Sequence, residues 1–259
     1  MDAGLYPMIF KRKSFHLFRD AGKLDQMELD GIVRVFDAAV PLDRSIKIAM
    51  KIVPAEKTSC KRGQEFCILL YSEKRGSYLQ NIGYIGEQLD LYLASRDIGA
   101  LWFGLGKPDE ATYNGLEFVI MLAIAKMRPG LFRKDLFKSR RKPLSEIWEG
   151  AAYQDIGNLA RFAPSACNTQ PWIVKASEKE IQVFRYEAPG KRGIMPKDRV
   201  SYYNRIDIGI FLLFLDLCLA NQDISFEKTV MKDSSEGTGE IVPAAHYWIK
   251  DRAHTNGII

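Results

Sequence analysis

Residues 11–16 group positive charges around a hydroxyl. Lys11, Arg12 and Lys13 are followed by Ser14 and, two positions further on, by His16. Arginine presents a planar fork of donors, lysine a compact charge and serine a short hydrogen bond, and phosphate oxygens accept all three. The segment therefore indicates a phosphate site, although basic stretches near the N-terminus are solvated tails in most proteins.

A second candidate site is the segment 162–172. It follows an expected helix and contains two prolines and several small residues, which make a rigid turn that a ligand can approach closely. Ser165, Asn168 and Gln170 place donors and acceptors at short spacing, as the edge of a heteroaromatic ring requires. A purely structural turn would not need so many polar side chains, so we interpret the segment as part of a binding site.

Two further segments are less specific. Four of the five residues 138–142 are basic, and on charge alone an exposed linker explains them. Residues 99–106 follow an expected helix end and could bring backbone amides to a ligand. Their glycine spacing does not match a nucleotide-binding fingerprint.

The composition is that of a globular protein. Hydrophobic residues make up 47% of the 259 and charged residues 27%, which suits one large domain or two small fused units. The net charge of +5 is mild, so we expect no nucleic-acid partner. The four cysteines and three histidines lack metal-site spacing, so we predict no metal. Because no apolar run is a credible membrane span, we predict a cytoplasmic protein without a membrane partner.

Helices and strands are mixed along the chain, in an α+β pattern that starts again after the basic linker at 138–143. Apolar periodicity and β-branched runs predict the elements. The expected helices are 24–40, 80–97, 144–162 and 204–223, and the expected strands are 46–53, 65–71, 117–125, 172–176, 181–186, 224–231 and 246–250.

The two halves of the chain also repeat in sequence. At an offset of 126 positions (223 − 97), the segment 82–98 shares nine identities in seventeen positions with 208–224. The matches include a glycine and two aspartates without a gap, which shared helix composition explains poorly. We therefore predict an internal duplication in which two long apolar helices pack together in a pseudo-twofold arrangement.

Together these segments resemble the nitroreductase family of FMN-dependent oxidoreductases. Residues 12–18 are similar to its N-terminal Arg-Arg-Ser-x-Arg-x-Phe motif, with His16 in place of an arginine. Residues 163–172 closely match its Ala-Pro-Ser-x-x-Asn-x-Gln-Pro-Trp motif, and the basic run to Lys142 resembles the segment that completes its phosphate site.

The resemblance implies a nitroreductase-like fold in which two tandem α/β units form a pseudo-dimer within one chain. The first half, 1–130, keeps the phosphate-binding motif, and the second, 131–259, keeps the Pro-Ser turn. Family dimers bind FMN at the subunit interface with one motif from each subunit. We therefore expect one composite site and one FMN per chain, with the second site free to decay.

In this interpretation the flavin carries the chemistry and no side chain is a catalytic base. NADH or NADPH would be the electron donor, and a nitro compound, a quinone or another small molecule would be the acceptor. The expected cofactor-binding residues are Lys11, Arg12, Lys13, Ser14, His16, Trp102, Gly104, Leu105, Lys138, Arg140, Arg141, Pro164, Ser165, Ala166, Asn168 and Gln170. The alternatives are a flavin-binding protein without turnover, for storage or sensing, and a degenerate member without flavin. We expect a monomer or a weak homodimer.

Overall fold

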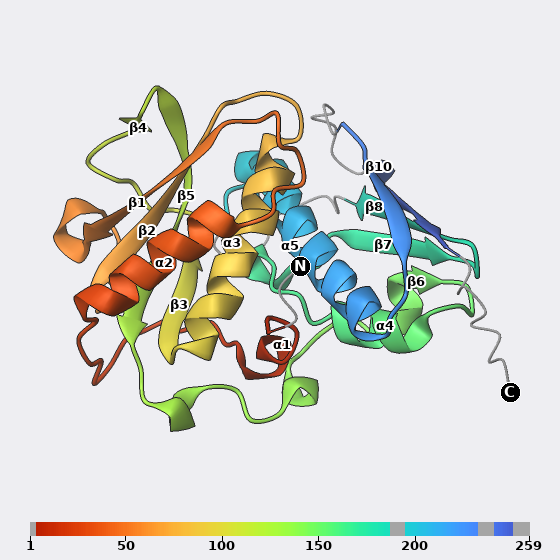
Figure 1. Cartoon of the computed structure of the whole chain (residues 1–259), viewed down its shortest axis with the longest axis horizontal. Helices are drawn as coiled ribbons and strands as arrows, with labels where there is room; N and C mark the ends of the chain where they lie inside the picture. Colours follow the sequence, from red (N-terminus) through yellow and green to blue (C-terminus); the bar gives the residue numbers. More distant parts are fainter. Residues whose placement is uncertain (1–3, 187–194, 233–240, 251–259) are drawn as a thin grey trace, which may run out of the picture.

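The computed structural model describes residues 4–186, 195–232 and 241–250. It consists of two tandem α/β units whose long helices lie together at the centre of the molecule (Figure 1). The first unit contains α1 (Met8–Lys11), α2 (Gln26–Ala38), β1 (Ile48–Pro54), β2 (Phe66–Ser72), α3 (Tyr78–Ser95), β3 (Ile98–Phe103), β4 (Thr112–Tyr113) and β5 (Leu116–Lys126). The second contains β6 (Trp148–Glu149), α4 (Gln154–Ala160), β7 (Trp172–Ala176), β8 (Glu180–Tyr186), α5 (Val200–Asn221), β9 (Phe226–Val230) and β10 (Ile241–Ile249).

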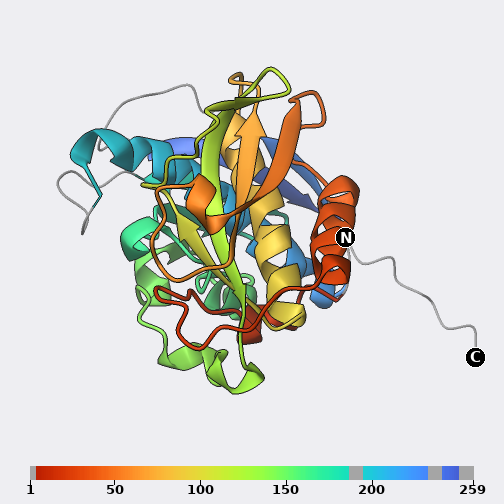
Figure 2. The ribbon, with the colours of Figure 1, turned by 90° about the vertical axis from the view of Figure 1, so that its left-hand side faces the viewer.

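The sheets of the two units have the same topology. In the first unit the order is β1-β2-β5-β3, in the second β7-β8-β10-β9, and all these neighbours are antiparallel. In both units the long helix follows the second strand of this order along the chain. Figure 2 shows the first sheet facing the viewer, with α3 behind it. β4 and β6 are short additions to these sheets. The repeated topology confirms the two tandem units predicted from the sequence.

α3 and α5 cross at two glycines in equivalent positions. A Cβ atom on Gly83 would lie 2.0 Å from the carbonyl oxygen of Ile206, and one on Gly209 would lie 1.9 Å from that of Gln80. The offset between the glycines, 209 − 83 = 126, also relates Gln80 to Ile206. Each contact is thus the image of the other about a pseudo-twofold axis. Backbones this close leave no room for a side chain, which explains the glycine at both positions.

α5 is buried on every side, and most of its side chains are apolar. It packs against α3, α4 and the second sheet, and all its side chains from 203 to 219 are buried. The buried carboxylate of Asp216 accepts hydrogen bonds from Tyr84 Oη and Tyr247 Oη, both at 2.7 Å, and from Lys228 Nζ at 2.5 Å. These donors offset the cost of burying the charge.

α2 begins at a capping box. Asp25 Oδ1 accepts from the backbone N–H of Glu28 at 2.8 Å, and Glu28 Oε2 accepts from that of Asp25 at 3.2 Å. The pair satisfies two backbone donors that the helix itself leaves unpaired, and so fixes where the helix starts. The observed helix lies within the predicted range 24–40.

The helix predicted over 144–162 is wrong in its first part. A 3-10 turn (Leu144–Glu146) and β6 occupy this part, and only α4 is α-helical. Gly150 has φ of +103°, and a Cβ atom there would lie 2.0 Å from the carbonyl oxygen of Ala176. Gly150 therefore allows the backbone to pass close to β7 directly after β6, which pairs with β7 in parallel, and the buried Trp148 packs from a strand rather than from a helix.

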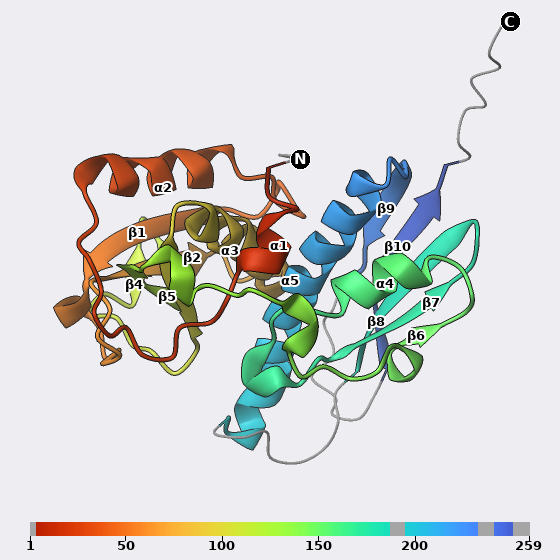
Figure 3. The ribbon, with the colours of Figure 1, turned by 90° about the horizontal axis from the view of Figure 1, so that it is seen from below.

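The segment between the units passes beside the N-terminal segment (Figure 3). The backbone N–H of Arg133 donates to the carbonyl oxygen of Lys11 at 3.1 Å. This contact brings the basic segment after the first unit next to residues 11–16. Within the described residues, no helix combines the length and apolar character that crossing a membrane requires.

Candidate functional site

A cavity of about 440 Å³ lies between the two units. Both units contribute to its walls, which are largely apolar and aromatic. The lining residues are Arg12, Ser14, His16, Arg62, Leu101, Trp102, Phe103, Gly104, Leu105 and Ile120 from the first unit, and Pro164, Ser165, Ala166, Cys167, Met195, Tyr203, Ile206, Asp207 and Ile210 from the second.

The chain after Arg12 runs extended along the edge of β3. Ser14 forms a parallel bridge with Ala100, and the N–H of Phe15 donates to the carbonyl oxygen of Ala100 at 3.0 Å. Side chains alternate in an extended segment, so Phe15 enters the core while Ser14 and His16 line the cavity.

Arg12 is buried and paired with two carboxylates of α3. Its Nε donates to Asp90 Oδ2 at 2.8 Å, its Nη2 lies 2.7 Å from the same oxygen, and Glu87 Oε1 lies 3.7 Å from Nε. Burial and the charge of Asp90 raise the pKa of Glu87 well above its ordinary value, and Arg12 opposes this shift. The ion pair with Asp90 already offsets much of the positive charge of Arg12.

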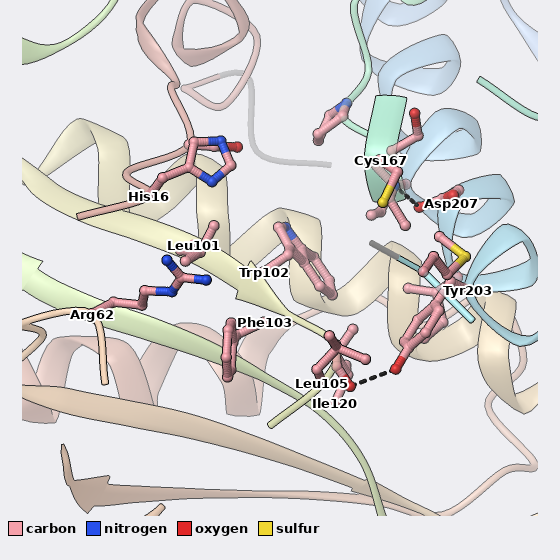
Figure 4. Close-up of a pocket in the computed structure, with 18 of the residues that line it drawn as sticks. His16, Arg62, Leu101, Trp102, Phe103, Leu105, Ile120, Cys167, Tyr203 and Asp207 are labelled. Atoms are coloured by element: carbon pink, nitrogen blue, oxygen red, sulfur yellow. Dashed lines mark hydrogen bonds between the residues drawn. The ribbon is translucent and has the colours of Figure 1, made fainter. Parts of the chain in front are cut away.

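Trp102 is fixed by the same carboxylates. Its indole N–H donates to Asp90 Oδ2 at 3.0 Å and to Glu87 Oε2 at 3.2 Å. The ring lies over Gly86 of α3, where a Cβ atom would come within 2.4 Å of it. The hydrogen bonds of its N–H and the contact with Gly86 orient the indole, which lies beside the cavity in Figure 4.

Tyr203 links the units across the cavity. Its hydroxyl donates to the carbonyl oxygen of Gly104 at 2.5 Å, as drawn in Figure 4. A Cβ atom on Gly104 would lie 2.6 Å from the Tyr203 ring, so the close approach requires glycine. The bond joins α5 to the loop after β3 and closes one side of the cavity.

The wall from the second unit is a tight turn at residues 164–170. Cys167, Asn168 and Gln170 have φ of 49°, 55° and 48°, a left-handed conformation that is uncommon outside glycine. The N–H of Gln170 donates to Ser165 Oγ at 3.0 Å, and this bond holds the turn closed.

Asp207 anchors the same turn from α5. Its Oδ1 accepts from the N–H of Ala166 at 2.9 Å. Burial raises the pKa of Asp207 to about 8, although hydrogen bonds from Ala166 and Thr169 oppose the shift. At neutral pH the carboxyl is therefore mostly protonated. Asn81, at the equivalent position (207 − 126 = 81), likewise accepts from the backbone of Leu42, at 2.8 Å.

Two guanidinium groups that do not line the cavity, those of Arg133 and Arg141, lie close enough to Arg12 to be affected by its charge. Burial, together with the neighbouring charge of Arg12, lowers the pKa of Arg133 to about 10, and burial with the charges of Arg133 and Arg12 lowers that of Arg141 to about 10. Arg141 donates to Asn168 Oδ1 at 2.9 Å and to the carbonyl oxygen of Phe162 at 3.1 Å. Its Nε is buried without a hydrogen-bond partner among the described residues, so this cluster has donor capacity left for an anion.

The structure brings the two predicted motifs together at one cavity. Of the predicted residues, those that line it are Arg12, Ser14, His16, Trp102, Gly104, Leu105, Pro164, Ser165 and Ala166. The remaining ones are not part of its lining: Lys11, Lys13, Lys138, Arg140, Arg141, Asn168 and Gln170.

Most of these outer residues have protein partners. Lys11 pairs with Asp97 at 2.6 Å, and Lys13 donates to the carbonyl oxygen of Leu131 at 3.0 Å. Asn168 Nδ2 donates to the carbonyl oxygen of Arg140 at 3.2 Å, and Gln170 Oε1 accepts from the N–H of Lys142 at 2.8 Å. The two amides thus hold the basic linker against the turn.

Sequence reasoning missed Arg62, Arg133, Tyr203 and Asp207. Arg62 and Arg133 lie in segments between predicted elements and carry no motif. Asp207 could have been found from the internal repeat, because it aligns with Asn81 on the equivalent helix. Tyr203 offered no such signal, because its role depends on a contact with the other unit.

The sequence from residue 4 to 218 matches the family model described as "Putative TM nitroreductase". The chain belongs to this nitroreductase family. A protein of Thermotoga maritima described as a "putative nitroreductase" has the same fold, with a TM-score of 0.61 at 16% identity over 95% of this chain and 93% of that one. The predicted nitroreductase-like fold is thereby confirmed. A search of curated proteins by sequence found no match.

Shorter nitroreductases are similar to part of the chain. A nitroreductase family protein of Clostridium difficile matches 56% of this chain over 96% of its own length, with 15% identity and a TM-score of 0.42. A protein of Desulfovibrio desulfuricans described as a "putative nitroreductase in complex with FMN" matches 56% of this chain over 95% of its own length, with 17% identity and a TM-score of 0.41.

Proposed function

We propose that the cavity between the units binds one FMN and that the protein is an NAD(P)H oxidoreductase acting on nitro compounds, quinones or related small acceptors. The observation that supports this most directly is the meeting of residues 12–16 of the first unit with residues 164–167 of the second at one cavity. Since one chain supplies both parts, a second copy is not needed to complete the site.

The residues present fit FMN. The volume of about 440 Å³ lies in the range of cofactor and small-molecule sites, and aromatic and apolar walls suit a planar ring. Arg133 and Arg141 offer positive charge, and the buried Arg141 Nε offers a donor without a partner among the described residues. We assign the phosphate to this arginine cluster, with Arg12 contributing less because it is paired with Asp90 and Glu87.

The chemistry that FMN supplies when bound is two-electron transfer: NAD(P)H gives up a hydride, and with a proton from solvent a nitro group becomes a nitroso group plus water. The protein provides position. Trp102, held by Asp90 and Glu87, and the turn at residues 164–167, held by Asp207, form walls for the ring. Tyr203 closes the cavity by its bond to Gly104 and limits access of water.

The equivalent region on the other side of the pseudo-twofold axis differs in ways that favour a single site. Lys228 occupies the position of Trp102 (228 − 126 = 102), and its ammonium pairs with Asp216, the equivalent of Asp90. A lysine and two tyrosine hydroxyls surround that carboxylate. A charged side chain replaces the aromatic wall that a flavin ring would contact.

The test is to add FMN to the purified protein, desalt it, and count the retained flavin per chain from its absorbance after acid release. We expect one FMN per chain, and NADH or NADPH oxidation that depends on a nitro or quinone acceptor. Ala166→Trp would fill the cavity and abolish retention, whereas the matched control Val40→Trp, at the equivalent exposed position of the other unit, would leave it unchanged.

Each other outcome selects an alternative. Flavin retained without acceptor-dependent turnover would indicate a flavin-binding protein for storage or sensing. No retained flavin at micromolar protein would indicate a degenerate member and would refute the proposal. Two flavins per chain, with one lost in Val40→Trp, would refute the single site.

A further inference from the structure

Arg62 brings a positive charge to the apolar side of the cavity. Its side chain is half-buried, lines the cavity and lies over the ring of Phe103, with 5.6 Å between the guanidinium carbon and the ring centroid. In Figure 4 it extends beside Leu101 and Phe103, on the side opposite Cys167 and Asp207. No carboxylate of the described residues lies within ion-pair distance of it.

The loop that carries Arg62 is held independently of the guanidinium. The N–H of Arg62 donates to Gln64 Oε1 at 2.9 Å, and its carbonyl oxygen accepts from the N–H of Phe18 at 2.9 Å. Gly63 follows with φ of +80°, which sets the turn. The side chain is thus directed to the cavity by its backbone, without an ion pair of its own.

The other charged groups of the lining are compensated or mostly neutral. Arg12 is paired with Asp90 and Glu87, and burial raises the pKa of Asp207 to about 8, which leaves its carboxyl mostly protonated at neutral pH. Among the described guanidinium and carboxyl groups that line the cavity, Arg62 therefore carries the uncompensated charge. A cation beside apolar side chains attracts an anion more strongly than one in water.

We infer that Arg62 is a specificity-determining residue that selects aromatic acceptors bearing an acidic group, such as a carboxylate. This inference rests on the proposed function. The phosphate of the cofactor has its own cations in the Arg133 and Arg141 cluster, which leaves Arg62 for the molecule that shares the cavity with the ring. An arginine fork binds a carboxylate through two parallel hydrogen bonds.

The test compares 4-nitrobenzoate with its neutral analogue 4-nitrobenzamide in the FMN-loaded protein. We expect wild type to favour the benzoate in kcat/KM by about 10- to 100-fold, the value of a charge-assisted hydrogen bond. Arg62→Gln reduces the preference to within about 3-fold of unity, with the larger loss of kcat/KM on the benzoate, and Arg62→Lys restores part of it. Lys61→Gln removes a charge from the same loop outside the cavity and keeps the full preference.

Three results would overturn the inference: an unchanged preference in Arg62→Gln, a tenfold weaker affinity of that variant for FMN, or a raised KM for NADPH without a change in preference. The last two would make Arg62 a ligand of the cofactor or the donor. Quenching of tryptophan fluorescence by benzoate and benzamide gives the same comparison as dissociation constants without turnover. A protein that turns over neither acceptor thus refutes the proposed function, while the binding preference still tests Arg62.

Discussion

Replacing Gly83 or Gly209 by alanine changes the stability of the protein in opposite directions, depending on whether the helix crossing requires a glycine there. If either glycine were an ordinary helix residue, replacement by alanine would stabilise the protein, since alanine is about 1 kcal/mol better than glycine inside a helix. If the crossing requires them, Gly83→Ala and Gly209→Ala both destabilise it.

The size of the effect follows from the distances. The new Cβ atom would lie 2.0 Å from the carbonyl oxygen of Ile206, whereas ordinary contact begins at 3.4 Å, so the helices must separate by about 1.4 Å (3.4 − 2.0). The position of the Cβ atom is fixed by its own backbone and the atom it meets is a backbone carbonyl oxygen, so no rotamer change can relieve the contact. Overpacking typically costs about 1 to 3 kcal/mol and occasionally more, and a clash with a backbone carbonyl belongs at or above the upper end, so after the gain in propensity we expect a net loss of about 2 to 3 kcal/mol.

The assay is equilibrium unfolding in urea, with the thermal midpoint as a second measure, where the loss corresponds to about 4 to 12 °C. Gly31→Ala in α2 is the matched control, because the obstacle there is the hydroxyl end of Tyr92, which can rotate away. The double variant should lose less than the sum of the two single ones, since the helices separate only once. Wild-type stability in either single variant, or strict additivity in the double one, would refute the reasoning.

Two further predictions concern buried charges. Asp207→Asn keeps the acceptor for Ala166, as Asn81 does for Leu42, but removes a group whose pKa is about 8 in the folded state and 3.8 in the unfolded state. Between pH 4 and 8 the wild-type carboxyl binds a proton in the folded state but not in the unfolded state. As the pH rises through this range, the free energy of unfolding of wild type therefore falls relative to that of the variant, by up to about 1.4 kcal/mol per pH unit. If the free energies from urea unfolding change with pH in parallel for the two proteins, this prediction is wrong. Arg12→Gln leaves the buried carboxyl groups of Asp90 and Glu87 without their cation, so we expect the free energy of unfolding from urea denaturation to fall by about 3 to 5 kcal/mol. If that variant is as stable as wild type but binds FMN much more weakly, Arg12 serves the phosphate rather than the core.

The elements that were predicted well have a local signal. α3 and α5 are long and strongly apolar, and α2 has both its periodicity and its Asp25 cap in the sequence. The predicted helix over 144–162 failed because Gly150 and the pairing of β6 with β7 override the local apolar spacing. Whether a short apolar run forms a strand or a helix depends on its neighbours, which sequence periodicity does not reveal.

Some residues of the candidate site could be predicted from the sequence, and others could not. The turn at residues 163–172 and the basic segment at 11–16 were recognisable because their chemistry is contained in short stretches of chain. Arg62 and Tyr203 could not be found in this manner. Each acts through groups distant in sequence: Arg62 lies over Phe103, and Tyr203 donates to Gly104 across the interface of the units.

The sequence by itself determined that the chain is a duplicated α/β protein with one motif kept in each half, because repeats and motifs are properties of residue order. The tertiary structure decided which charges remain available. It pairs Arg12 with Asp90, protonates Asp207 through burial, and leaves Arg62 without a carboxylate among the described residues. Charge compensation depends on distance and burial, and both are set by how the two units pack.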